Sequence, residues 1–236
     1  MTIEILYPEI CNLFGDSGNI RYLKKCLPDA VFIETFLHSR PAFADGKSDM
    51  IFMGPMTERA QIKVIGQLSP YKDELKKAID DNKIILFTGN AMEVLFKYII
   101  TDDNKKTDAL GIFDFYAKQQ LMHRFNSIEI CRFNEIDIVG FKTQFTMTYG
   151  DNSTCFFANV ERGIGINEKS KLEGIHTNNF FGTNLIGPIL VLNPYFTEYL
   201  MSLLGIKNPK VAFREEAIKA YNARLKDLRT CKFNEH

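Results

Sequence analysis

The stretch 83–96 constrains the fold more than any other part of this sequence. It begins with an apolar run at 84–87, which has the length and composition of a buried strand. A corner of small residues at 88–91 follows. Apolar side chains from Met92 to Ile99 then recur at helical spacing. The stretch therefore predicts a strand, a sharp turn and a helix, which together form a unit of α/β folds.

In α/β enzymes a corner of this kind often holds the nucleophile, because the turn lifts one side chain above the sheet and presents backbone N–H groups to it. Here Gly89 has no side chain, Asn90 carries an amide, and Thr88 still belongs to the strand. Two interpretations are open on the corner alone. It is either an active site that has lost its chemistry or an ordinary turn that serves packing.

The first hundred residues alternate between strands and helices. Short apolar runs predict strands at 3–7, 31–35, 49–54 and 84–87, with helical stretches between them. Such alternation favours an α/β fold with a mainly parallel sheet and helices on both faces. Ligands of such sheets bind at the carboxyl ends of the strands, so these ends are where we expect a site.

The pattern of apolar residues changes after residue 110. Short apolar segments recur between turn residues, and we expect them to be strands that extend the sheet, some of them antiparallel. Two helices are predicted near the end, one at 195–204 and one after Pro209. The sequence contains no internal repeat or linker, so we predict one domain at 1–205 with a helical extension, 206–236, packed on it. The recurring apolar segments lie at 128–130, 136–139, 163–166 and 180–183.

Composition argues against several classes of function. The 29 basic and 29 acidic residues balance, whereas nucleic-acid-binding proteins usually carry a basic surplus. The five cysteines form no C-x-x-C pair and the four histidines have no metal-ligand spacing, so we expect reduced thiols, no metal and no cofactor. No signal peptide or membrane span is recognised. We therefore expect a cytoplasmic protein that binds neither nucleic acid nor membrane.

A few polar side chains could serve chemistry near the predicted strand ends. Cys11 lies in a loop there, but no histidine is near it in sequence, which favours a structural thiol. Asp16 and Asn19 could cap the first helix or line a ligand site, and both interpretations stay open. Glu93 could face the pocket or solvent, and His176 could replace a missing base.

Five stretches, in order along the chain, resemble the class I glutamine amidotransferases of the cobyric acid synthase-like type. Among these, the glutaminase subunits of bacterial lipid II isoglutaminyl synthases are the most similar. The resemblance implies a single-domain, flavodoxin-like fold. The stretches lie at 6–20 (with Asn-Leu-Phe-Gly-Asp-Ser-Gly-Asn), 54–61, 84–98, 139–141 (Val-Gly-Phe) and 173–194 (with Asn-Asn-Phe-Phe-Gly-Thr-Asn).

The resemblance also implies a chemistry. In this family a cysteine thiolate attacks the side-chain amide of glutamine, a histidine carries the proton, and backbone N–H groups stabilise the oxyanion. The released ammonia passes to a partner synthase. For lipid II isoglutaminyl synthase this implies a Mur-ligase-like partner that activates a peptidoglycan stem glutamate with ATP.

This sequence departs from the family pattern at each of those parts. Gly89 stands at the nucleophile position, and Ile186 stands at the histidine position. Asn90 begins a pair that is Gly-Gly in the family. After Gly54, the glycine-rich turn contains Pro55, which has no N–H to donate. The resemblance thus implies a vestigial pocket formed by these five residues, with no catalytic residue in it.

We therefore expect a catalytically degenerate glutamine amidotransferase-like protein, related to lipid II amidation, that binds a partner synthase or senses a small ligand. A small anion or a glutamine-like molecule is the predicted ligand, because the N–H of Asn90 would sit at a helix N-terminus. The alternative is an active subunit that supplies ammonia, through a rearranged site, to a Mur-ligase-like or cobyric acid synthase-like partner. Unrelated chemistry based on Asp16, Glu93 or His176 is a third hypothesis, which no spacing supports.

Overall fold

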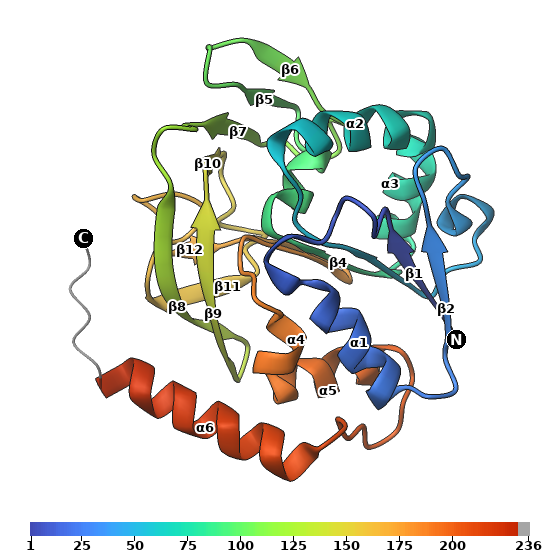
Figure 1. The fold of residues 1–236 in the computed structure, drawn as a ribbon, viewed down its shortest axis with the longest axis vertical. Helices are drawn as coiled ribbons and strands as arrows, with labels where there is room; N and C mark the ends of the chain where they lie inside the picture. Colours follow the sequence, from blue (N-terminus) through green and yellow to red (C-terminus); the bar gives the residue numbers. More distant parts are fainter. Residues whose placement is uncertain (231–236) are drawn as a thin grey trace.

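The centre of the fold is a six-stranded sheet with strands in the order β13-β14-β4-β3-β1-β2 (Figure 1). All neighbours in it are parallel except β13, which pairs with β14 in the antiparallel sense. The computed structural model describes residues 1–230, so Cys231 and His236 lie outside the described residues. The six strands are β1 (Thr2–Leu6), β2 (Val31–Thr35), β3 (Met50–Met53), β4 (Ile84–Thr88), β13 (Ile175–Thr177) and β14 (Phe180–Thr183).

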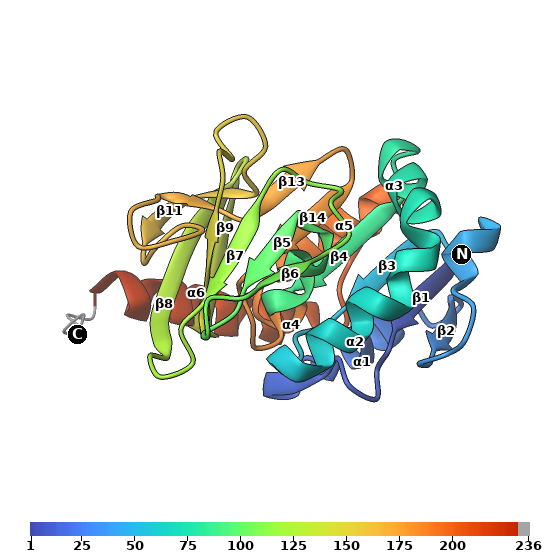
Figure 2. The ribbon, with the colours of Figure 1, turned by 90° about the horizontal axis from the view of Figure 1, so that it is seen from above.

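Apolar side chains pack on both faces of this sheet. Each strand contributes to both, because its successive side chains point to opposite sides. In β4, Ile84 and Leu86 pack into one apolar cluster, while Ile85 and Phe87 pack into the other. Helices α2 (Glu58–Leu68) and α3 (Lys72–Asp80) cover the side of Ile85 (Figure 2). The other face is covered by α1 (Ser17–Cys26), α4 (Ile189–Leu192) and α5 (Pro194–Leu203). The predicted parallel sheet with helices on both faces is confirmed.

Three short 3-10 helices lie in the loops between these strands and helices. They are η1 (Leu13–Gly15), η2 (Ala42–Asp45) and η3 (Ser69–Tyr71). Within residues 1–230, no helix combines the length and the apolar character needed to cross a membrane.

The middle of the chain forms two further sheets beside the central one, and here the prediction was partly wrong. Of the segments expected to extend the central sheet, 180–183 does so, 128–130 and 136–139 lie in the third sheet, and 163–166 is a loop. A two-residue turn joins β8 to β9, so these strands pair with each other along their whole length. The second sheet has the order β10-β7-β5-β6, with β5 (Tyr98–Ile100), β6 (Lys106–Asp108), β7 (Tyr116–Gln119) and β10 (Thr146–Tyr149). The third has the order β12-β11-β8-β9, with β8 (Phe125–Phe133), β9 (Ile136–Gln144), β11 (Ala158–Arg162) and β12 (Leu172–Glu173).

The helix predicted after the corner at Gly89 is also different in the structure. The chain forms a 3-10 helix, η4 (Gly89–Leu95), and then turns into strand β5. The apolar residues that suggested a continuing α-helix are buried all the same, with Phe96 and Ile99 in the core. Periodicity thus identified the buried side chains but not the element that carries them.

The last helix, α6 (Arg214–Thr230), lies along the outside of the β8–β9 pair (Figure 1). Its Tyr221 hydroxyl donates a hydrogen bond to the carbonyl of Asp137, at 2.9 Å. Near its end, Arg229 forms ion pairs with Asp137 and Glu161, at 3.2 and 2.7 Å. The division into a domain at 1–205 and an extension at 206–236 stays a prediction, and 231–236 lie outside the described residues.

A buried ion pair joins the two outermost strands of the third sheet, and its carboxylate also contacts β14 of the central sheet. Lys142 of β9 and Glu173 of β12 are both fully buried and in contact. Lys142 also donates to the carbonyls of residues 164 and 165, each at 2.7 Å. Glu173 also accepts hydrogen bonds from the Thr183 hydroxyl and from the Asn184 N–H, both at 2.8 Å. The three Lys142 contacts join residues that are 22 to 31 positions apart in the sequence.

We expect Glu173→Gln to lower the free energy of unfolding by about 3–5 kcal/mol, because it leaves the Lys142 charge buried without a counter-charge. Urea denaturation followed by circular dichroism measures this change. Glu135→Gln is the matched control, because the Glu135 carboxylate pairs with Arg132 at the surface and is 96% exposed. That control should change stability by less than about 0.5 kcal/mol. Equal effects of the two substitutions would contradict the structural role given to the buried pair.

Candidate functional site at the strand ends

Gly89 lies where β4 meets η4, at the carboxyl edge of the central sheet. Its φ of +58° lies in the left-handed region, which glycine adopts without strain. A Cβ atom placed on Gly89 would lie 2.6 Å from Cβ of Pro55 and 3.3 Å from Cγ2 of Ile186. All three residues are buried. The space into which a side chain at this corner would project is therefore already filled by the two neighbouring corners.

The side chain of Asn90 fastens this corner to the turn after β3. Its amide oxygen accepts a hydrogen bond from the Met56 N–H at 3.0 Å, and its amide nitrogen donates to the Met56 carbonyl at 2.8 Å. The carbonyl of Asn90 in turn accepts a hydrogen bond from the Gln61 amide of α2, at 2.8 Å. Both polar ends of the Asn90 side chain are thus engaged by protein groups.

A buried carboxyl group lies beside the same corner. The hydroxyl of Thr88 donates a hydrogen bond to Oδ2 of Asp16, at 2.5 Å. Gly54 lies close against this group, because a Cβ there would be 3.1 Å from Oδ2 and 2.5 Å from the carbonyl oxygen of Cys11. Burial raises the pKa of Asp16 to about 6, although the Thr88 hydrogen bond acts to lower it. The Asp16 carboxyl group makes no capping hydrogen bond to α1. The N–H of Ser17, at the start of the helix, donates to the Asn12 side chain.

Glu93 is the second buried carboxyl group near the corner. It lies on η4 and is fully buried, accepting hydrogen bonds from the Gln61 amide at 2.9 Å and from the Thr146 hydroxyl of β10. Burial raises the pKa of Glu93 to about 7, and the nearby charge of Glu58 acts in the same direction. Of the two orientations predicted for Glu93, exposure to solvent is therefore wrong. The carboxyl group joins the central sheet to the second sheet.

Among residues 1–230, no thiol and imidazole come together at the Gly89 corner. Cys11 is buried, its Sγ lies 3.8 Å from Sδ of Met56, and burial raises the pKa of its thiol well above the usual range, which makes it a poor nucleophile. His176 lies on the other side of the sheet, with its ring stacked on Phe181 at 4.5 Å between centroids. Burial lowers the pKa of this histidine. Within residues 1–230, no group of three or more His, Cys, Asp or Glu side chains could hold a metal ion.

Comparison with known proteins decides the family. No protein-family model matches the chain. The GatD subunit of lipid II isoglutaminyl synthase (glutamine-hydrolyzing) from Staphylococcus aureus (strain N315) is 33% identical over 205 residues, which cover 85% of this chain and 83% of that subunit. The chain belongs to the GatD family. The GatD subunit from Streptococcus pneumoniae (strain ATCC BAA-255 / R6) is 28% identical over 200 residues, which cover 82% of this chain and 76% of the relative.

Solved structures confirm the predicted fold of this GatD-family chain. The crystal structure of a glutamine amidotransferase superposes with a TM-score of 0.54 at 11% identity, covering 86% of this chain and 99% of that one. A likeness at that identity shows the fold alone. The identities to the two GatD subunits confirm the predicted relation to lipid II isoglutaminyl synthase subunits. The likeness to cobyric acid synthases and the replacement of catalytic residues stay predictions.

The structure places Gly54 and Pro55 after β3, Gly89 and Asn90 after β4, and Ile186 in the segment after β14. That these five residues are a vestigial pocket stays a prediction. Sequence reasoning missed the contacts that occupy the corner, among them Asp16 with Thr88 and Glu93 with Thr146. These partners lie 72 and 53 residues apart, so no local pattern links them. The one available signal was chemical, since a carboxyl group in an otherwise apolar stretch needs a partner when buried.

We expect Gly89→Ala to lower the free energy of unfolding by about 2–4 kcal/mol, the sum of a strained left-handed conformation and a clash with Pro55. Gly46→Ala is the control, because Gly46 has a similar φ of +71° but no atom within 4 Å of its Cβ position. It should cost only about 1 kcal/mol. Adding Pro55→Gly should recover part of the loss in Gly89→Ala, and additive effects in this double-mutant cycle would contradict the filled corner.

The two raised pKa values of Asp16 and Glu93 predict a pH dependence. The folded state binds more protons than the unfolded state between the ordinary carboxyl pKa, near 4, and the raised value. The free energy of unfolding must therefore fall as pH rises through this interval. Between pH 5 and pH 8 we expect wild type to lose about 2 kcal/mol more than Glu93→Gln. Glu135→Gln, at a surface carboxylate that is 96% exposed, should keep the wild-type profile in urea titrations. Parallel profiles for all three proteins would rule out a raised Glu93 pKa.

Proposed function

We propose that this chain is a catalytically degenerate, amidotransferase-like subunit that acts in lipid II amidation by binding a partner synthase. The observation that carries the proposal is the filled corner at Gly89. Glutaminase chemistry of this family needs a nucleophile, a proton carrier and N–H donors around one position. Here that position carries no side chain, and Pro55 and Ile186 pack into the space above it.

Three further features support the loss of catalysis. Pro55 cannot donate an N–H to an oxyanion in the turn after β3. The Cys11 thiol and the His176 imidazole are engaged elsewhere, on opposite sides of the central sheet. Restoring a cysteine at position 89 alone would place its Cβ against Pro55. The chain therefore needs changes at several corners at once before the family mechanism could operate.

The partner-binding role rests on family membership. Both GatD relatives are subunits of a glutamine-hydrolyzing synthase. A subunit that loses its own chemistry can keep its binding surface, because the surface and the active site depend on different residues. We propose a Mur-ligase-like synthase as the partner and the cytoplasm as the location. The sensing of glutamine or a small anion at the corner is less well supported, because Asn90 already binds Met56 there.

The decisive assay is glutamate release from glutamine by the purified chain, alone and after co-expression with a Mur-ligase-like synthase subunit. We expect no release above the protein-free baseline in either case, with the Staphylococcus aureus relative and its synthase as the positive control. Cys155 is a partly buried cysteine whose carbonyl accepts a hydrogen bond from the His176 N–H. Release that is lost in Cys11→Ser or Cys155→Ser would instead support the alternative, an active subunit with a rearranged site.

Size-exclusion chromatography of the co-expressed proteins tests partner binding separately. We expect the two chains to elute as one complex. Separate elution would remove the partner-binding role without restoring catalysis. Calorimetry with glutamine, glutamate and chloride tests the vestigial pocket, and heat of binding from any of them would contradict the view that the corner is closed.

A further inference from the structure

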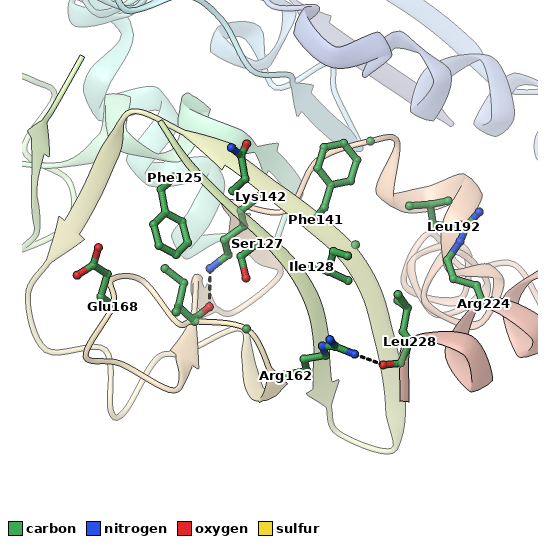
Figure 3. Close-up of a pocket in the computed structure, with 15 residues that line it drawn as sticks. Phe125, Ser127, Ile128, Phe141, Lys142, Arg162, Glu168, Leu192, Arg224 and Leu228 are labelled. Carbon is green, nitrogen blue, oxygen red and sulfur yellow. Dashed lines mark hydrogen bonds between the residues drawn. The ribbon is translucent and has the colours of Figure 1, made fainter. Parts of the chain in front are cut away.

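A cavity of about 930 Å³ lies between the third sheet, the segment after β14 and helix α6 (Figure 3). Its volume falls in the range of small-molecule sites, which is roughly 300–1,000 Å³. The cavity is separate from the corner at Gly89. It borders that corner only through Gly187, which follows Ile186. Lys142 of the buried ion pair lines the cavity, but Cys11, Asp16, Glu93 and His176 do not.

The part of the cavity that faces α6 has apolar walls. Ile128 and Phe141 come from the paired strands β8 and β9, while Leu192 and Leu228 come from α4 and α6 (Figure 3). Phe141, on the edge strand β9 of the third sheet, is 38% exposed. An exposed aromatic ring inside a concave site is the kind of surface that an apolar ligand covers.

The charges around the cavity are unequally distributed. Arg224 of α6 lies beside Leu192, while Glu168 lies at the opposite end near Phe125 (Figure 3). A second arginine of the lining, Arg162, donates a hydrogen bond to the carbonyl of Leu228. Among the described residues, no hydrogen-bond or ion-pair partner is recorded for the Arg224 side chain, so its guanidinium is available to a ligand. Lys142 is not available, because its ammonium group already contacts Glu173 and two carbonyls.

We propose that this cavity binds a small amphipathic anion, a single apolar chain with a carboxylate or phosphate head. The head would pair with Arg224, because a guanidinium binds either group through two parallel N–H donors. The apolar chain would lie against Phe141 and the leucines. Glu168 repels an anion at the other end, so the charge distribution also sets the direction of the ligand. This inference does not depend on whether the Gly89 corner hydrolyses glutamine.

Ligand binding here would also stabilise the attachment of α6, which forms one wall. That helix is held by the Tyr221 hydrogen bond, by ion pairs of Arg214 and Arg229, and by a hydrogen bond from Arg162 to the Leu228 carbonyl. Surface ion pairs hold weakly, so α6 should open locally more readily than the central sheet. A ligand that contacts both α6 and β9 adds to their association. Slower amide hydrogen exchange in α6 is therefore expected on binding.

The test is isothermal titration calorimetry of the full chain with decanoate and with decyl phosphate, which separates the two head groups. We expect at least one to bind, and decanol, acetate and inorganic phosphate to bind at least tenfold more weakly. Arg224→Glu should weaken binding at least tenfold. Arg21→Glu, at an exposed arginine of α1 that does not line the cavity, should leave the affinity unchanged.

A second variant distinguishes loss of the ligand site from loss of the fold. Leu192→Trp should fill the apolar part of the cavity and abolish binding, while its circular dichroism spectrum and thermal midpoint stay near those of wild type. The proposal would be overturned if neither anion binds, if decanol binds as tightly as decanoate, or if both variants bind like wild type. Hydrogen exchange in α6 that is unchanged by saturating ligand would place the site elsewhere.

Discussion

The contact of Gly89 with Pro55 and Ile186 is the constraint on which the candidate site depends. It follows from the sheet itself. Strands β3, β4 and β14 are neighbours in parallel register, with Phe87 opposite Met53 and Thr88 opposite Thr183, so the turns after them meet at one edge. In such sheets this edge is where ligands bind. Here the same geometry brings three turns into van der Waals contact, and the edge is closed by packing.

Buried polar groups hold the outer sheets in place around this closed edge. Glu93 reaches Thr146 of the second sheet, and Lys142 of the third sheet reaches Glu173, which binds the end of β14. Burying such groups costs desolvation energy, and their net contribution to stability is small or negative. What they supply is selectivity, since any other arrangement of the sheets would leave a buried charge or carboxyl without a partner. The same desolvation raises the pKa of Glu93.

The sequence predicted those parts of the molecule that depend on local patterns. Apolar runs located the parallel strands, and the small residues at 88–91 located the corner, because both signals lie within a few residues. Sequence patterns did not predict contacts between residues that are distant along the chain. They also misidentified the element where one pattern fits two structures. The spacing from Met92 to Ile99 fits an α-helix, but the chain forms η4 and then β5. Helical spacing arises in both because buried 3-10 turns and strands also place apolar residues every two to four positions.

The segment after β14 connects the closed corner to the cavity beneath α6. Ile186 packs on Gly89, and its N–H donates to the carbonyl of Phe141 at 3.1 Å. The ring of Phe141 lies so close to Gly187 that a Cβ there would be 2.2 Å from it. A molecule resting against Phe141 would therefore press on the same segment that closes the corner. The closed corner and the cavity are therefore joined through two successive residues, Ile186 at the corner and Gly187 at the cavity wall.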